Sequence, residues 1–189
     1  MHPAVSGGGG GGAAAPRRPR VPGHLGVTPL WRPAYVAIGS NLNGPAAQVV
    51  AAFERMRSLP ATRLERRSRL YSSAPVGRPD QPDYVNAAAG LLTQLGARDL
   101  LNSLLDIERA MGRERHERWG PRIIDLDLVW IVGHPIDEAG LTVPHPAVSE
   151  RNFVLYPLAD IAPTLGIPGL GRVSDLLLRA GDAGLSVLA

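Results

Sequence analysis

The order in which apolar periodicities follow one another along the chain constrains the fold most. A strand-like run starts at Ala34, and Pro45 fits the first turn of a helix that runs to about residue 58. Strand-like patterns follow over about 62–71 and 84–93, then a helical pattern over 97–111 and a strand-like one over 123–132. This β-α-β-β-α-β order predicts an α+β, ferredoxin-like sandwich. Helical patterns over about 148–160 and 173–180 predict a C-terminal helical extension.

Residues 1–33 differ in composition from the rest of the chain. They contain a run of glycine over 7–12, four arginines and repeated prolines, and no acidic residue. Because such a segment buries little apolar surface, we expect a disordered tail before a single domain over 34–189. A glycine run cannot form the amphipathic helix of a transit peptide, and no secretory apolar segment is visible, so we expect a cytoplasmic protein.

Two residue types are absent from the chain, and their absence excludes several chemistries. Without cysteine there are no disulfides, thiolate metal sites or cysteine nucleophiles. Without lysine, neither Schiff-base chemistry nor a Walker A phosphate loop is available. Phosphate groups would have to be bound by arginine, backbone N–H groups or metal. No apolar run reaches the length of a membrane span, so we expect no membrane association.

A pair of aspartates on the last predicted strand follows an arginine-rich loop. Asp125 and Asp127 are two residues apart, so their carboxylates leave the same face of the strand, while Leu126 and Leu128 point into the core. Magnesium is usually held by one or two carboxylates together with substrate phosphates, whereas two unneutralised carboxylates would repel each other. The pattern therefore predicts metal-assisted transfer of a phosphorus group, with phosphate charge met by Arg113, Arg115, Arg118 and Arg122.

Four motifs occur in a fixed order between residues 34 and about 163. They are AYVAIGSNL (34–42), DQPDYVNAA (80–88), RWGPRIIDLD (118–127), and TVPHP (142–146) with RNFVL (151–155). In this order they resemble the signature segments of the 6-hydroxymethyl-7,8-dihydropterin pyrophosphokinase family of folate biosynthesis. The resemblance implies transfer of the β,γ-diphosphate of ATP to the hydroxymethyl group of the pterin, with release of AMP and a requirement for magnesium.

The resemblance also implies roles for individual residues. Asp125 and Asp127 match ligands of two magnesium ions, and Arg113 and Arg122 match catalytic arginines on the phosphates. Further ATP contacts match Glu108, Arg115, Arg118, Trp119, Thr142, His145 and Arg151. Tyr84 and Phe153 would stack on the pterin ring and Asn86 would bind its amide edge. The other pterin contacts match Ser73, Ala74, Val76 and Trp119.

Some positions depart from the family pattern, and other functions compete with it. Leu105, Ala74 and Gly140 replace residues common in the family, and the loop from Arg113 to Trp119 is one residue shorter. These changes concern ATP affinity and loop movement, because the aspartates and both principal arginines are kept.

One alternative is an RNA-binding ferredoxin-like module, but residues 84–89 lack the aromatic strand motif of such modules. Another is a two-metal phosphodiesterase, which normally gathers more carboxylates or histidines. We therefore expect small-molecule partners, ATP and the pterin, with no nucleic acid. We favour a monomer.

Overall fold

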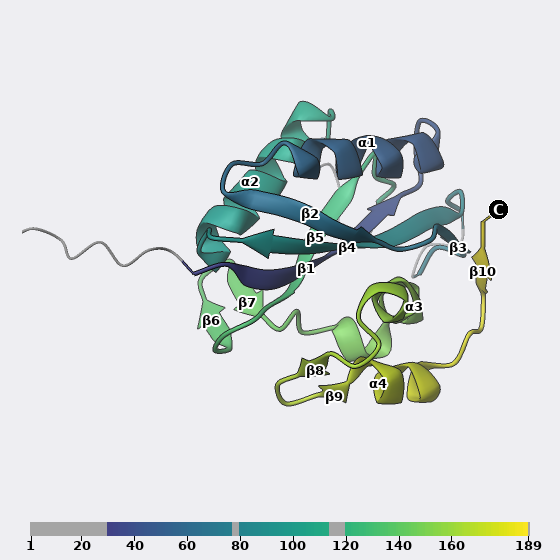
Figure 1. Cartoon of the computed structure of the whole chain (residues 1–189). Helices are drawn as coiled ribbons and strands as arrows, with labels where there is room; N and C mark the ends of the chain where they lie inside the picture. Colours follow the sequence, from purple (N-terminus) through teal and green to yellow (C-terminus); the bar gives the residue numbers. More distant parts are fainter. Residues whose placement is uncertain (1–29, 77–79, 114–119, 189) are drawn as a thin grey trace, which may run out of the picture.

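A sheet between two helical layers forms the centre of the molecule (Figure 1). The computed structural model describes residues 30–76, 80–113 and 120–188. Within them the sheet has six strands with antiparallel pairings, in the order β10-β3-β4-β1-β5, and β2 also pairs with β4. The strands are β1 (Arg32–Ser40), β2 (Thr62–Arg67), β3 (Tyr71–Ser73), β4 (Tyr84–Thr93), β5 (Asp125–Ile131) and β10 (Leu185–Val187). The predicted ferredoxin-like order is confirmed.

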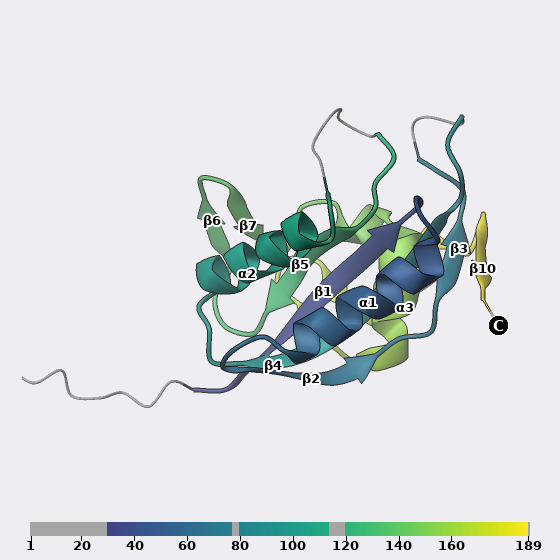
Figure 2. The same cartoon turned by 90° about the horizontal axis from the view of Figure 1, so that it is seen from above.

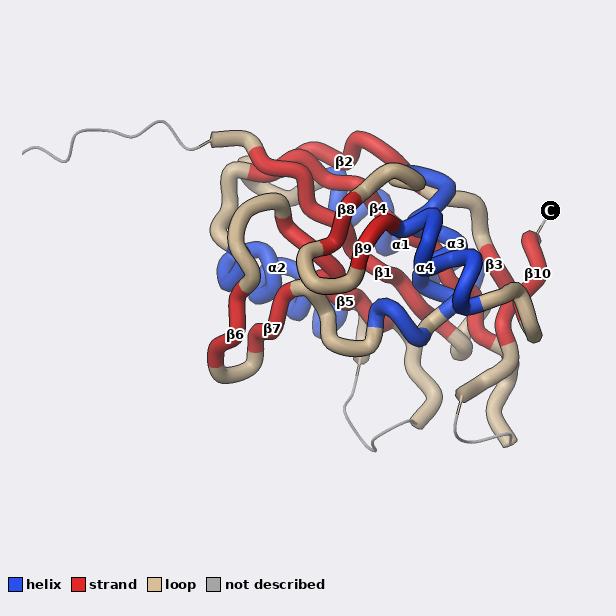
Figure 3. Tube along the Cα trace, turned by 90° about the horizontal axis from the view of Figure 1, so that it is seen from below, coloured by secondary structure: helices blue, strands red, loops and turns tan. Residues whose placement is uncertain are grey.

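The helices of the described residues cover both faces of this sheet. Figure 2 shows α1 and α2 side by side on the upper face, and Figure 3 shows α3 and α4 on the lower face. These helices are α1 (Pro45–Arg57), α2 (Ala97–Ala110), α3 (Asn152–Ile161) and α4 (Val173–Ala180). The predicted C-terminal helical extension is thus present. None of the described helices is long and apolar enough to cross a membrane.

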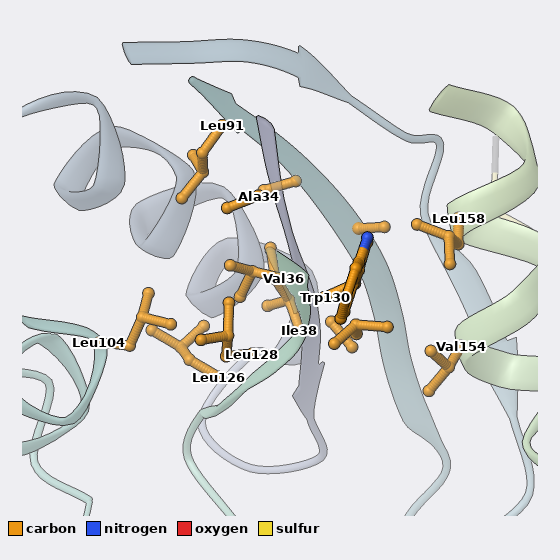
Figure 4. Close-up of a cluster of buried hydrophobic side chains, with 14 of the residues drawn as sticks. Ala34, Val36, Ile38, Leu91, Leu104, Leu126, Leu128, Trp130, Val154 and Leu158 are labelled. Carbon is orange, nitrogen blue, oxygen red and sulfur yellow. The ribbon is translucent and has the colours of Figure 1, made fainter. Parts of the chain in front are cut away.

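Burial on both faces explains the composition of the central strand β4. Its residues from Val85 to Leu91 are all buried, and they include three consecutive alanines, which let helices approach from either side. Figure 4 shows Leu126 and Leu128 on the side of Leu104 from α2, whereas Trp130 lies on the side of α3. The two leucines therefore point into the core, as the sequence predicts.

A β-bulge in β5 accounts for the change of side at Trp130. Leu128 lies opposite Val36 and Trp130 lies opposite Tyr35, so β5 has one extra residue at this point. The extra residue sends Trp130 to the same face as Asp125 and Asp127, on the side of α3. The bulge thus separates the polar end of this face of the strand from its apolar end.

Several predicted boundaries were wrong by a few residues. The single strand predicted over 62–71 is interrupted, because the hydroxyl of Ser68 accepts a hydrogen bond from the N–H of Ala88 at 2.8 Å and breaks the ladder. The helix predicted over 148–160 is a 3-10 turn, Val148–Glu150, followed by α3, because Arg151 between them is extended. The strand predicted over 123–132 starts at Asp125, and β1 starts at Arg32 rather than at 34.

No periodic signal in the sequence marks the shortest strands. One of them, β10, forms an edge of the main sheet. The others form two hairpins, β6–β7 and β8–β9, with the bounds β6 (Ile136–Glu138), β7 (Leu141–Val143), β8 (Gly166–Ile167) and β9 (Gly171–Arg172). Segments of two or three residues are too short to show an alternation of polar and apolar side chains. Their positions could therefore be found only in three dimensions.

Asp160 on α3 connects the lower helical layer to the break between β2 and β3. Its carboxylate accepts hydrogen bonds from the Arg69 guanidinium at 2.6 and 3.1 Å and from the Tyr71 hydroxyl at 2.9 Å. Burial alone would raise the pKa of Asp160, but these donors hold it below its ordinary value. The carboxylate thus binds more strongly to its partners when it is charged.

We expect Asp160→Asn to lower the free energy of unfolding at pH 7 by about 1–2 kcal/mol, since Arg69 is largely exposed. The pKa of Asp160 is lower in the folded state, so its contribution is complete above the unfolded value of about 3.9 and is lost as pH falls through the folded value. Urea unfolding of the two proteins at pH 7 and pH 3 measures the loss of stability and its dependence on pH. A difference between the two proteins that stayed constant over this range would contradict the assignment.

Candidate active site

A cavity of about 340 Å³ opens on the sheet face that carries the two aspartates. Its size is within the range of small-molecule sites. Eleven of the sequence-predicted site residues line it, namely Ser73, Ala74, Val76, Tyr84, Asn86, Arg122, Asp125, Asp127, His145, Arg151 and Phe153. Residues from β3, β4, β5 and α3, far apart in the sequence, thus meet in one cavity.

Asp125 is the most strongly paired residue of the cavity. Its Oδ1 lies 2.6 Å from Nη1 of Arg113, and its Oδ2 pairs with Nη1 of Arg122. The expected repulsion between two unneutralised carboxylates is therefore largely relieved at Asp125. Burial lowers the pKa of Arg113, but the charges of Asp125 and Glu108 raise it above its ordinary value, so this arginine stays charged.

Asp127 has more distant partners than Asp125. Its Oδ2 lies 3.7 Å from Nη1 of Arg151 and 3.9 Å from Nε2 of His145, and its side chain is 37% exposed. Its partial burial and the charge of Asp125 raise the pKa of Asp127. A cation between the two carboxylates would lower it again, because the charged form would then be favoured.

His145 presents a defined edge to this part of the cavity. The backbone N–H of His145 donates to Val129 on β5 at 2.9 Å, and Nδ1 of the ring accepts the N–H of Ala147 at 3.2 Å. Burial lowers the pKa of His145, which favours the neutral ring. With Nδ1 as the acceptor, the proton of the neutral ring is on Nε2, so the ring offers a donor toward Asp127 and the cavity.

The floor of the cavity is made of small residues that the sequence analysis did not single out. Gly39 on β1 lies opposite Asn86 on β4 and opposite Asp125 on β5, and Ala37 lies opposite Asp127. A methyl group on Gly39 would lie 3.6 Å from Oδ1 of Asn86. The absence of a side chain here keeps the space between the amide and the carboxylate open. Ile38 and Val154 complete the lining that was missed.

Asn86 has a fixed orientation at one end of this floor. Its Nδ2 donates to the Ser73 hydroxyl at 2.9 Å, so Oδ1 is the atom that lies toward Gly39. Phe153 and Tyr84 also line the cavity, and the Tyr84 hydroxyl donates to Gln81 Oε1 at 3.3 Å. This region therefore combines two aromatic rings with an amide acceptor, which suits a flat heteroaromatic ring with N–H donors.

Asn41 holds two segments beside the cavity and was not predicted as a site residue. Its Oδ1 accepts the N–H of Arg122 at 2.7 Å, and its Nδ2 donates to the carbonyl of Pro82 at 3.2 Å. The neighbouring Ser40 hydroxyl donates to the carbonyl of Ile123 at 2.6 Å. A polar pair directly after a buried strand gave a local signal for a turn, but nothing in the sequence marks its distant partners.

Three predicted ATP contacts of the described residues lie outside the cavity lining. Glu108 is 3% exposed and accepts the N–H of Leu126 at 2.7 Å, so its carboxylate lies in the protein interior. Arg113 lies behind Asp125 and also pairs with Glu108. Thr142 is exposed on the β6–β7 hairpin and donates to Asp137 at 3.1 Å. Arg115, Arg118 and Trp119 lie outside the described residues.

Residues 35–163 match the model of the 7,8-dihydro-6-hydroxymethylpterin-pyrophosphokinase (HPPK) family. The chain belongs to this family. An HPPK of Pseudomonas aeruginosa is 46% identical over 82% of this chain and 95% of its own length. One of Haemophilus influenzae is 42% identical over 79% of this chain and 93% of its own length. Both are named 2-amino-4-hydroxy-6-hydroxymethyldihydropteridine pyrophosphokinase.

Solved structures agree with the HPPK assignment at the level of the fold. The HPPK-DHPS of Plasmodium falciparum, solved with pteroate, superposes with a TM-score of 0.65 at 13% identity. The match covers 79% of this chain but only 42% of the Plasmodium chain. This likeness therefore supports the ferredoxin-like fold of the HPPK chain described here.

Proposed function

We propose that this chain transfers the β,γ-diphosphate of ATP to the hydroxymethyl group of 6-hydroxymethyl-7,8-dihydropterin and releases AMP, a step of folate biosynthesis. Membership of the HPPK family gives the reaction. One observation in the structure supports it most: the carboxylate pair and Arg122 share a single cavity with Asn86, Tyr84 and Phe153. A phosphate-binding end and a ring-binding end are thus adjacent, as transfer between two bound substrates requires.

The chain's own residues would bind and orient both substrates. The pterin would lie between Tyr84 and Phe153, with its N–H edge toward Oδ1 of Asn86. Arg122 would turn from Asp125 to the phosphates, where a guanidinium can donate two parallel hydrogen bonds. The hydroxyl oxygen would then attack the β-phosphorus, the bond to the α,β-bridging oxygen would break, AMP would leave with that oxygen, and the hydroxyl proton would be released.

Asp125 and Asp127 fit the requirements of magnesium. Two carboxylates on one strand face, one of them loosely paired, match the one or two that this ion takes beside substrate phosphates. We propose two ions here, held by these two aspartates; when bound, magnesium would polarise the phosphate oxygens and offset their charge. His145 and Arg151 would contact the same phosphates from the other side of Asp127.

The two alternative functions receive less support. An RNA-binding sheet needs an open face for stacking bases, whereas helices cover both faces here. A two-metal phosphodiesterase needs further ligands, and no group of three or more histidine or acidic residues suited to a metal occurs among residues 30–76, 80–113 and 120–188. The monomeric state, the cytoplasmic location and the disordered tail stay predictions from the sequence.

We expect AMP to form from ATP only when the pterin is present, and the pterin product to carry two phosphates. Chromatographic separation of the nucleotides, with mass spectrometry of the pterin, measures both. A reaction without pterin is the control for hydrolysis. Formation of ADP together with a singly phosphorylated pterin would contradict the proposal and would identify an ordinary kinase.

A further inference from the structure

Glu108 carries a carboxylate in the protein interior that the proposed reaction leaves without a role. It lies in the last turn of α2, and its side chain is 4% exposed. Burying a carboxylate costs free energy that an apolar residue of similar size would avoid, so a purely structural position would favour leucine or methionine. The position in fact continues the buried stripe of Leu100 and Leu104 at a spacing of four residues.

The side-chain contacts of Glu108 with described residues lead to the proposed phosphate end of the site. Its Oε1 accepts the N–H of Leu126, the residue between the two aspartates, and pairs with Nη1 of Arg113. The backbone carbonyl of Glu108 also accepts the N–H of Arg113 at 3.0 Å. One residue therefore holds both the backbone and the guanidinium of Arg113 and fixes them to β5.

Arg113 is shared between two carboxylates that differ in accessibility. Asp125 lines the cavity, where substrate or a cation can reach it, whereas Glu108 does not line it. A ligand that engages Asp125 would compete with Arg113 for that carboxylate, whereas it would not reach Glu108. Because a guanidinium has five N–H donors, Arg113 can remain bound to Glu108 and still donate to a phosphate.

We propose that Glu108 is a positioning residue that holds the Arg113 guanidinium beside the cavity while Asp125 exchanges partners. The proposal rests on the phosphate-binding role proposed above for Arg113. It differs from a direct contact of Glu108 with ATP, since Glu108 acts through Arg113. It also differs from a purely structural role, since its effect on the reaction depends on Arg113 being present.

A double-mutant cycle separates these roles. Glu108→Gln keeps the size of the side chain and an acceptor for Leu126 but replaces the carboxylate that pairs with Arg113 by a neutral amide. We expect it to lower the single-turnover rate of AMP formation on the order of ten- to a hundred-fold at saturating substrates. In a protein that already carries Arg113→Ala, the same change should lower the rate less than about three-fold. Asp106→Asn, an exposed position on the same helix, is the matched control and should keep the rate within about two-fold.

The outcomes distinguish this proposal from the assignment of Arg113. Equal losses on Glu108→Gln with and without Arg113 would overturn the positioning role while the role of Arg113 stands. An unchanged rate in Glu108→Gln would do the same. If Arg113→Ala alone kept the full rate, the phosphate-binding role of Arg113 would fail, and the inference with it.

A measurement on the ligand-free Asp125→Asn protein, in which Arg113 keeps its pair with Glu108 but loses the Asp125 carboxylate, keeps the proposal testable if Glu108→Gln does not fold. Nitrogen-15 relaxation of the Arg113 side chain in Asp125→Asn should show a guanidinium about as rigid as the backbone, and the signal is assigned by its loss when Arg113→Ala is added. Arg57, whose side chain is 70% exposed and whose Nη1 lies 3.6 Å from the exposed carboxylate of Glu54, gives the reference for a solvent-exposed guanidinium. An Arg113 side chain as mobile as that of Arg57 would overturn the proposal.

Discussion

Replacing either Asp125 or Asp127 by asparagine should abolish turnover but change stability in different directions. Loss of one carboxylate removes a magnesium ligand, and the several kcal/mol of charge stabilisation that such an ion provides correspond to a rate loss of about a thousand-fold or more. Steady-state AMP formation over a magnesium titration measures this loss. Near-normal activity in both variants would show that the metal assignment is wrong.

The metal-free stabilities of the two variants should differ, because the two carboxylates have different partners. Asp125 pairs with Arg113 and Arg122, so Asp125→Asn should lower the free energy of unfolding by about 1–3 kcal/mol. Among the described residues the charged partners of Asp127 lie at 3.7 and 3.9 Å, and its pKa is raised, so Asp127→Asn should leave stability unchanged or raise it slightly. Urea unfolding in a chelating buffer compares them, and Asp175→Asn on the exposed face of α4 is the control.

Arg122→Ala should lower the single-turnover rate by about a hundred- to a thousand-fold, the usual cost of losing one hydrogen-bond donor to the transition state. The variant is a clean test because the backbone of Arg122 is held independently of its side chain: the N–H donates to Asn41 at 2.7 Å and the carbonyl accepts from Asn41 at 3.0 Å. Rapid-quench measurement of AMP at saturating ATP and pterin isolates the chemical step.

Two further variants complete the test of Arg122. Arg122→Lys should restore part of the rate, since lysine supplies the charge without the planar fork of donors. Arg57→Ala, an exposed arginine on α1, should leave the rate unchanged. If Arg122→Ala kept its single-turnover rate and only weakened ATP binding, the arginine would be a binding contact rather than a transition-state donor.

Local periodicity predicted the parts of the site that lie on regular elements. Asp125 and Asp127 alternate with buried leucines, so their common face followed from the two-residue period of a strand. Asn86 and Tyr84 lie on the same face of β4 for the same reason, since both are even-numbered residues of one strand. The order of the elements also predicted the sheet, because each long helix and strand has its own spacing of apolar residues.

The features that periodicity could not predict depend on distant pairs. Asn41 joins segments around residues 82 and 122, and Ser68 interrupts a strand only because Ala88 lies opposite its hydroxyl. For Glu108 a local signal was present, since it follows Leu104 at the spacing of a buried stripe. A charged residue at such a position indicates a buried partner, which is what the structure has at Leu126 and Arg113.

The strand β10 has a practical consequence for anyone who joins this protein to another sequence. Leu185 pairs with Ser73, whose hydroxyl fixes the amide of Asn86, so the last strand supports the wall at the proposed ring-binding end. A purification tag or reporter attached directly after Val187 would disturb the pairing of β10 with β3. The first residue of β1, Arg32, lies eight residues from Ser40, about 26 Å along an extended strand. Fusions are therefore better placed at the amino end of β1.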